Sequence, residues 1–227
     1  EVLETSVLED LAHVSQIMER CRRFGVTFAL DDFGTGYSSL TYLKRLPVTE
    51  LKIDQSFVRG MLDDPDDLSI LVGILGLASA FRREVIAEGV ETVEHGEMLL
   101  QLGCQLAQGN GIARPMPAAD FPGWAATWRA HSAWSNRRPV SRDDLPLLFA
   151  STEHRAWLVA LDRHLKGERE APPTLDCHQC RFGQWLYAEG ASGHGTRTNI
   201  KSIEHLHRRI HVSAAELCLL HSQEKPL

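Results

Sequence analysis

The sequence lacks the features that mark membrane, secreted and nucleic-acid-binding proteins. Its longest apolar run, around residues 70–81, contains glycines and follows the spacing of an amphipathic helix, so no membrane segment is predicted. No secretory signal is visible either. The formal net charge of −6 argues against a protein that binds DNA or other nucleic acid non-specifically. An anionic substrate would therefore need metal ions to offset its repulsion by this chain.

Cysteine is also scarce, and its placement argues against a disulfide framework. The five cysteines form an odd and scattered set, which together with eleven histidines favours a reducing compartment and a bound metal. The chain starts at Glu1 rather than at methionine, in the middle of an expected element. We therefore expect it to be a fragment of a longer protein.

The first 130 residues predict strands that alternate with helices, and each strand ends in a polar residue. Residues 26–30 read as a buried strand that ends at Asp31 and Asp32, and a loop with Gly34 and Gly36 follows. The other strand ends are Glu1, Lys52 with Asp54, Glu88 and Gln108. The main helices are expected at residues 7–21, 66–81 and 92–102. This pattern predicts an α/β fold, a partial TIM-like barrel with about five of its eight parallel strands, and the missing strands should precede Glu1.

The paired carboxylates Asp31 and Asp32 predict a metal site. Carboxylate oxygens are hard ligands that suit Mg²⁺ or Mn²⁺, and active sites of parallel barrels lie where the strands end. The alternative is an Asp-rich turn that solvates the end of a strand. Taken singly, the other strand-end residues have equally ordinary explanations: a lysine at a rim, an acid at a strand end, a glutamine in a turn.

Five segments together resemble the C-terminal part of the EAL domain, the bacterial cyclic di-GMP phosphodiesterase. They are EVLE at 1–4, DDFGTGYSSL at 31–40, LKID at 51–54, IAEGVET at 86–92 and QGNGIARPMP at 108–117. Their order and spacing fit that family. The resemblance implies metal-dependent hydrolysis of cyclic di-GMP to linear pGpG in the bacterial cytoplasm.

The resemblance also assigns metal ligands. It makes Glu1, Asp31 and Asp32 ligands of a two-metal Mg²⁺ or Mn²⁺ site, with Asp31 as the bridging ligand. Glu4 is similar to the glutamate that anchors the loop after the Asp pair and ties dimer contacts to metal binding.

The catalytic roles follow from the same resemblance. Lys52 orients or polarises the attacking water, Glu88 holds the second metal or its water, and Gln108 helps to fix the site. Arg114 and Pro115 lie near the edge that binds guanine. The implied partners are cyclic di-GMP, a second copy of the chain bound through the barrel, and an upstream sensor or GGDEF domain.

The chain departs from the family in two places. The Glu-Ala-Leu signature and a ligating Asn, which lie upstream in the family, are absent, so we expect the polypeptide as given to be inactive alone. Asn110 and Gly111 stand where bulkier residues are common, which puts substrate packing there in doubt.

The second half of the chain is predicted to be a separate helical domain. Residues 1–130 form the barrel part, the polar and proline-containing residues 131–145 a linker, and residues 146–227 the second domain. Helices are expected at 151–166 and 200–219, with no strand pattern.

Three histidines lie on the apolar faces of these two helices and predict a zinc site. His207 and His211 are four residues apart, so both imidazoles can reach one ion, and His154 lies on the apolar face of the earlier helix. Cys180 would complete a tetrahedral set. Three alternatives remain: His154 as an ordinary core histidine, Cys177 or His178 as ligands, and Cys177 with Cys180 as a redox pair.

The segments HRAW at 154–157, CRFGQWL at 180–186 and HRRIH at 207–211 resemble a chemoreceptor zinc-binding (CZB) domain, a small all-α bundle. The combined hypothesis is a phosphodiesterase barrel regulated by a zinc-sensing domain. Its rivals are a receptor that binds cyclic di-GMP without hydrolysis, and a zinc or redox sensor with a vestigial barrel.

Overall fold

The structure, a computed structural model, describes residues 1–36, 40–135, 137–188 and 197–224. It divides into two compact units, residues 1–62 with 66–140, and residues 63–65 with 141–227. Residues 37–39, which belong to the DDFGTGYSSL segment of the EAL resemblance, lie outside the described residues. Among the described residues, no helix has the length and apolar content needed to cross a membrane.

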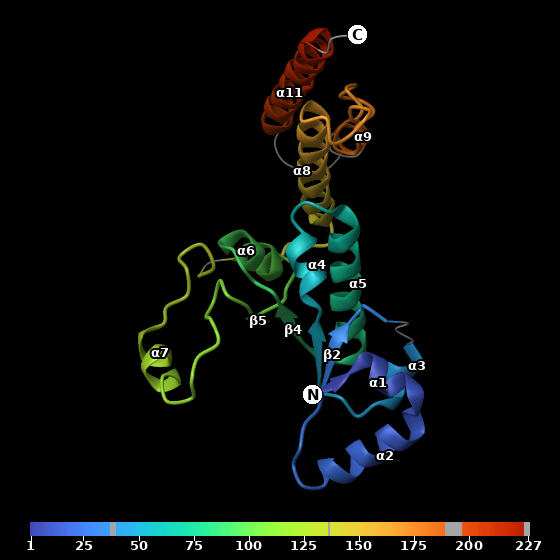
Figure 1. Ribbon diagram of the computed structural model, residues 1–227, viewed down its shortest axis with the longest axis vertical. Helices are drawn as coiled ribbons and strands as arrows, with labels where there is room; N and C mark the ends of the chain where they lie inside the picture. The colour runs from blue at the N-terminus through green and yellow to red at the C-terminus, as the bar shows by residue number, and fades with distance from the viewer. Residues whose placement is uncertain (37–39, 136, 189–196, 225–227) are drawn as a thin grey trace. The chain divides into compact units, whose positions relative to one another are not determined.

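The first unit is built on a parallel sheet of five strands (Figure 1). The strands are β1 (Val2–Leu3), β2 (Ala29–Phe33), β3 (Glu50–Ile53), β4 (Glu84–Glu88) and β5 (Leu106–Gln108). Their order in the sheet is the order of the sequence, and every neighbouring pair is parallel. The carboxyl ends of all five strands therefore lie at one edge, as the prediction of a parallel α/β fold requires.

Six described helices connect these strands, and a seventh, α7, follows the last of them. They are α1 (Glu4–Glu9), α2 (Leu11–Arg22), α3 (Leu40–Arg45), α4 (Gln55–Gly60), α5 (Pro65–Phe81), α6 (Val93–Gln101) and α7 (Phe121–Thr127). Leu51 and Ile53 of β3 and Leu68 and Leu71 of α5 are fully buried. Burial of each such side chain stabilises the fold by about 1.5–3 kcal/mol, so this packing fixes the strands that carry the polar ends.

In the first unit, two of the predicted elements were placed wrongly. The strand predicted at 26–30 runs from Ala29 to Phe33, because its pairing with β3 begins at Ala29, and Val26 is 46% exposed. The helix predicted at 7–21 is two helices that meet at Asp10. The carboxylate of Asp10 accepts a hydrogen bond from the backbone N–H of His13 (3.0 Å), so this residue starts a second helix instead of continuing the first.

The second unit is helical. Its described helices are α8 (Leu145–Leu165), α9 (Arg181–Ala188) and α11 (Arg197–Glu224). Helix α8 begins six residues before the predicted start at 151, inside the segment predicted to be a linker. Pro146 lies in its first turn, where the missing N–H costs nothing.

Helices α8 and α11 run in the same direction. His154 of α8 lies beside His211 of α11, and ten residues further along both helices His164 lies beside His221. Between these two levels Leu161 packs with Ala214 in a buried cluster that also holds Trp157 and Cys180. Because the two helices are parallel and share one buried cluster, histidines at equivalent positions along them lie side by side.

Candidate functional site

The two aspartates lie on an irregular part of β2. The register of β2 against β3 shifts between Leu30 and Phe33, and Asp32 has φ +55° in the left-handed region that non-glycine residues rarely adopt. In a regular strand, neighbouring side chains point to opposite faces. The irregularity lets one oxygen each of Asp31, Asp32 and Glu88 lie within 4.8 Å of one another. Three carboxylates so close together are a suitable ligand set for a hard divalent cation.

Lys52 lies at the centre of the acidic residues. Its Nζ is 2.8 Å from Asp31 Oδ1, 2.6 Å from Glu88 Oε1 and 3.1 Å from Glu1 Oε1, and the residue is 6% exposed. Burial alone would lower the pKa of Lys52. Hydrogen bonds to Asp31, Glu88 and Glu1 outweigh burial and raise that pKa above its ordinary value. The ammonium group therefore stays charged throughout the physiological pH range.

Gln108 positions Glu88. The two residues face each other across the β4–β5 pair, and Gln108 Nε2 donates a hydrogen bond to Glu88 Oε1 at 2.8 Å. The same oxygen accepts from Lys52, so the carboxylate is held from two sides. Burial, followed by repulsion from Asp31 and Asp54, raises the pKa of Asp32. Both effects disfavour its negative charge, and a bound cation would relieve them.

Glu4 connects the start of the chain to the loop that follows the Asp pair. It is 3% exposed, and its carboxylate accepts a hydrogen bond from the backbone N–H of Gly34 at 3.0 Å. A Cβ at Gly36 would lie 3.3 Å from the other oxygen of Glu4. The backbone of the loop at Gly34 and Gly36 therefore lies against the carboxylate of Glu4.

The segment after β5 does not join the acidic cluster in the described part of the chain. Arg114 and Pro115 are exposed and make no described contact with the acidic cluster. Gly111 donates its backbone N–H to Val90 O at 2.8 Å, and a Cβ there would lie 2.8 Å from the carbonyl of Glu91. This close backbone approach explains why a glycine occupies a position where a bulkier residue was expected, and sequence alone gave no sign of it.

The three histidines predicted to bind zinc lie together in the second unit. The ring centroids of His154 and His207 are 5.2 Å apart, and those of His207 and His211 are 4.7 Å apart. One nitrogen of each ring lies within 4.8 Å of the other two. His207 and His211 are 3% and 2% exposed.

Several buried nitrogens of this cluster have no hydrogen-bond partner among the described residues. They are Nδ1 of His154, Nδ1 of His207 and Nε2 of His211. The Nδ1 of His211 donates to the carbonyl of Leu175 at 3.1 Å, which leaves Nε2 with its lone pair. A buried polar nitrogen without a partner is costly, and coordination of a metal would remove that cost.

Cys180 lies next to the histidines, at the start of α9. Its Sγ is 3.2 Å from His207 Nε2 and accepts a hydrogen bond from the backbone N–H of Gly183 at 3.2 Å. Burial raises the pKa of the Cys180 thiol. The thiol would therefore need a positively charged partner, such as a metal ion, to lose its proton near neutral pH.

Burial keeps the histidines neutral. Burial, together with electrostatic interaction with His211 and His154, lowers the pKa of His207 to about 4. Burial also lowers the pKa values of His154 and His211. A neutral imidazole has a free lone pair, so the cluster is prepared to bind a metal at neutral pH.

Cys177 and His178, the predicted alternative ligands, make other contacts, and Cys180 too lies outside the group of three histidines. The ring of His178 stacks on Tyr187, with centroids 4.1 Å apart, and His178 is not in the three-histidine group. Cys177 and Cys180 are both free thiols, and the Cys180 thiol donates to the carbonyl of Cys177 at 3.6 Å.

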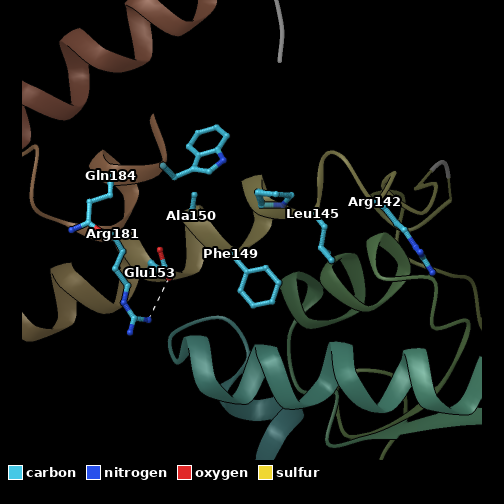
Figure 2. Close-up of a pocket in the computed structure, with 9 residues that line it drawn as sticks. Arg142, Leu145, Phe149, Ala150, Glu153, Arg181 and Gln184 are labelled. Atoms are coloured by element: carbon cyan, nitrogen blue, oxygen red, sulfur yellow. Dashed lines mark hydrogen bonds and ion pairs between the residues drawn. The ribbon is translucent and has the colours of Figure 1, made fainter. Parts of the chain in front are cut away.

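A separate cavity of about 670 Å³ lies along α8 and α9 (Figure 2). Figure 2 shows Phe149 and Leu145 among its lining residues, and a dashed line from Arg181 to Glu153. This ion pair has a length of 3.4 Å. None of the four residues predicted to bind zinc lines it. The cavity is therefore distinct from the histidine cluster.

Comparison with known families supports both halves of the sequence interpretation. The EAL domain family matches residues 1–115 and the chemoreceptor zinc-binding domain family matches residues 154–218. The family matches thus contain both groups of converging side chains.

Curated relatives match the first half of the chain. The bifunctional diguanylate cyclase/cyclic di-GMP phosphodiesterase MucR of Pseudomonas aeruginosa is 46% identical over 118 residues, which are 52% of this chain and 17% of MucR. The oxygen sensor protein DosP of Escherichia coli is 40% identical over 127 residues, which are 56% of this chain and 16% of DosP. The chain thus spans less than a fifth of the length of either relative.

Solved structures with the same architecture are EAL domains. The MucR phosphodiesterase in complex with c-di-GMP has a TM-score of 0.51 and 44% identity, covering 53% of this chain and 49% of that one. The EAL domain of Mycobacterium smegmatis DcpA has a TM-score of 0.53 and 40% identity, covering 57% of this chain and 58% of that one. The sheet, the acidic cluster and the family match agree, and the chain belongs to the EAL domain family, with a chemoreceptor zinc-binding domain in its second half.

Proposed function

We propose that residues 1–130 are the C-terminal part of a barrel that hydrolyses cyclic di-GMP to linear pGpG. The observation that carries this proposal is the convergence of Asp31, Asp32 and Glu88 around Lys52 at the carboxyl edge of a parallel sheet. Residues upstream of Glu1 supply the remaining strands and the remaining ligands. The similarity to a phosphodiesterase solved with c-di-GMP supports the choice of substrate.

Glu1, Asp31 and Asp32 would hold a pair of Mg²⁺ or Mn²⁺ ions at the acidic cluster, with Asp31 as the ligand shared by the two. All of these ligands are carboxylate oxygens, which hard divalent cations prefer. When bound, the ions would neutralise charge on the phosphoryl oxygens and lower the pKa of the attacking water.

The other residues of the cluster have supporting roles. Lys52 places a fixed positive charge beside the attacking water and the phosphate. Glu88 would hold the second metal or its water, and Gln108 fixes the orientation of Glu88 through the 2.8 Å hydrogen bond. Glu4 holds the loop after β2 at Gly34, so that this loop keeps the geometry of the Asp pair.

We further propose that His154, Cys180, His207 and His211 bind one zinc ion. Three imidazoles and one thiolate make a closed tetrahedral set, which is typical of structural zinc. The buried nitrogens without partners and the close approach of Cys180 Sγ to His207 support this assignment. Zinc would clamp α8, α9 and α11 together.

The two proposals together describe a phosphodiesterase that responds to zinc. The barrel would form a homodimer, and sensor or GGDEF domains would precede it in the full-length protein. If zinc regulates the barrel, turnover of cyclic di-GMP by the full-length protein changes when zinc is removed and returns when it is restored. Equal turnover in both states contradicts the regulatory role and leaves the hydrolysis intact.

The decisive experiment measures conversion of cyclic di-GMP to pGpG by the full-length protein with Mg²⁺ or Mn²⁺. Asp31→Asn should abolish turnover, whereas Asp162→Asn, an exposed carboxylate of α8, should leave it unchanged. Tight binding of cyclic di-GMP without hydrolysis would establish a receptor instead. If neither binding nor hydrolysis is found, the barrel has lost both functions and only the zinc domain remains.

A further inference from the structure

A second pair of histidines lies in the helical unit, away from the proposed zinc cluster. His164 of α8 and His221 of α11 have ring centroids 5.7 Å apart, with the ring planes at 70°. They lie ten residues further along their helices than His154 and His211, which corresponds to about 15 Å at the rise of an α-helix. The two groups are therefore separate.

The free nitrogens of this pair suit a metal. The Nδ1 of His164 lies 3.1 Å from the carbonyl of Arg169, and since a carbonyl only accepts, Nδ1 carries the proton and Nε2 keeps its lone pair. The Nε2 of His221 is buried and has no hydrogen-bond partner among the described residues. His164 thus has a nitrogen with an available lone pair, and His221 has a buried nitrogen that makes no hydrogen bond to a described residue.

The separation of the rings also fits a shared ion. With metal–nitrogen bonds of about 2.0–2.1 Å, two imidazoles on one ion place their ring centroids about 5–6 Å apart. The observed 5.7 Å lies in this range, so little movement of either helix is needed.

The helix ends add an electrostatic reason for a cation here. His164 lies in the last turn of α8 and His221 in the last turn of α11. Because the two helices run in the same direction, the negative ends of both macrodipoles come together at this level. A positive ion between the rings would interact favourably with both.

We propose that His164 and His221 form a second metal site, for a late first-row divalent ion such as Zn²⁺, Ni²⁺ or Cu²⁺. Imidazole nitrogen suits these ions, whereas Mg²⁺ prefers oxygen. In the described part of the chain no third His, Cys, Asp or Glu joins these two rings within 4.8 Å. Water completes the coordination, so this site exchanges its ion more readily than a closed four-ligand site does.

The experiment counts zinc bound to the 227-residue chain by equilibrium dialysis. All chains carry Asp31→Asn and the buffer contains excess Mg²⁺, so that the acidic cluster does not contribute. We expect two zinc ions per chain, and one for His164→Ala, His221→Ala and the double variant. The control His205→Ala, an exposed histidine of α11, should retain two.

A second measurement avoids dependence on folding of the variants. In the 227-residue chain with both histidines intact, the imidazole NMR signals of His164 and His221 should shift together with the second equivalent of zinc, after those of His207. If these signals do not move and His221→Ala keeps every zinc ion of the parent, the second site does not exist.

The two zinc proposals fail separately. Loss of one zinc ion in His207→Ala but none in His221→Ala supports the four-ligand site alone. Loss in His221→Ala but none in His207→Ala supports the two-histidine site alone.

Discussion

The carboxylate of Glu4 accepts a hydrogen bond from the backbone N–H of Gly34, thirty positions further along the chain, at 3.0 Å. This contact joins the first helix to the loop that follows Asp31 and Asp32. A hydrogen bond to a charged group contributes about 1.5–3 kcal/mol, which is enough to select one conformation of a loop.

Substitution of Glu4 should therefore act on the loop. Glu4→Ala leaves Gly34 N–H without its acceptor, and we expect turnover in the full-length protein to fall by about 10- to 100-fold, as that free-energy range implies. Glu4→Gln keeps an acceptor oxygen and should lose less. Steady-state kinetics at saturating Mg²⁺ measure both, and equal losses in the two variants would show that the charge, not the hydrogen bond, matters.

Replacement of Lys52 should destabilise the barrel part by an amount that does not vary with pH in the neutral range. The folded pKa of Lys52 is raised, so its contribution is fully present below the unfolded pKa of about 10.4 and is lost only as the pH rises through the folded value. Lys52→Gln should therefore lower the denaturation midpoint equally at pH 6 and pH 9. A deficit that grows from pH 6 to pH 9 would instead indicate that the folded pKa of Lys52 lies below its ordinary value.

Without metal, the helical unit should lose stability in mild acid. The pKa of His207 falls from 6.5 to about 4 on folding, so the unfolded chain binds a proton first as the pH drops. The stabilisation is present above pH 6.5 and is lost as the pH falls through about 4. Circular dichroism melts with a chelator at pH 7.5, 6, 5 and 4 should show the decline. His207→Gln should have a flatter profile, and parallel profiles would rule out His207 as the cause.

Gly183 should be essential for the placement of Cys180. A Cβ at this position would lie 1.8 Å from the carbonyl oxygen of Cys177, and the N–H of Gly183 donates to Cys180 Sγ. Gly183→Ala must shift the start of α9, so we expect zinc affinity to fall at least tenfold in competition with a chromophoric chelator.

Gly73→Ala provides the matched control. This glycine lies inside α5 with no atom within 4 Å of the added Cβ, so the substitution should leave zinc affinity unchanged and raise stability by about 0.5–1 kcal/mol. If Gly183→Ala behaves like Gly73→Ala, the backbone contact with Cys177 does not control the thiol.

Sequence reasoning predicted the parallel α/β fold and the grouping of Asp31 with Glu88 well, because strand ends in such folds always meet at one edge. It did not predict the shifted register at Asp31 and Asp32, since a local irregularity depends on the neighbouring strand, which periodicity does not report. The break at Asp10 is a similar case. Asp10 could have been recognised as an N-cap, but the apolar spacing on either side of it continued without interruption.

In the helical unit, the sequence predicted which histidines of one helix share a face, but not which histidines of two helices meet. The i, i+4 spacing of His207 and His211 placed both on the buried face, and the helices confirm that placement. The contact between His164 and His221 could not be foreseen, because it depends on the direction in which α8 and α11 run, and the sequence of either helix alone does not determine this.

The strand order β1-β2-β3-β4-β5 has a consequence for biosynthesis. Each strand after β1 pairs with the strand made immediately before it, so no strand has to wait for a distant, later segment of the described chain. The sheet can grow at one edge as the chain leaves the ribosome, in the direction of translation. Partly made chains would then always expose a fresh parallel edge, and β5 is the last described edge that a nascent chain would have to protect from pairing with its neighbours.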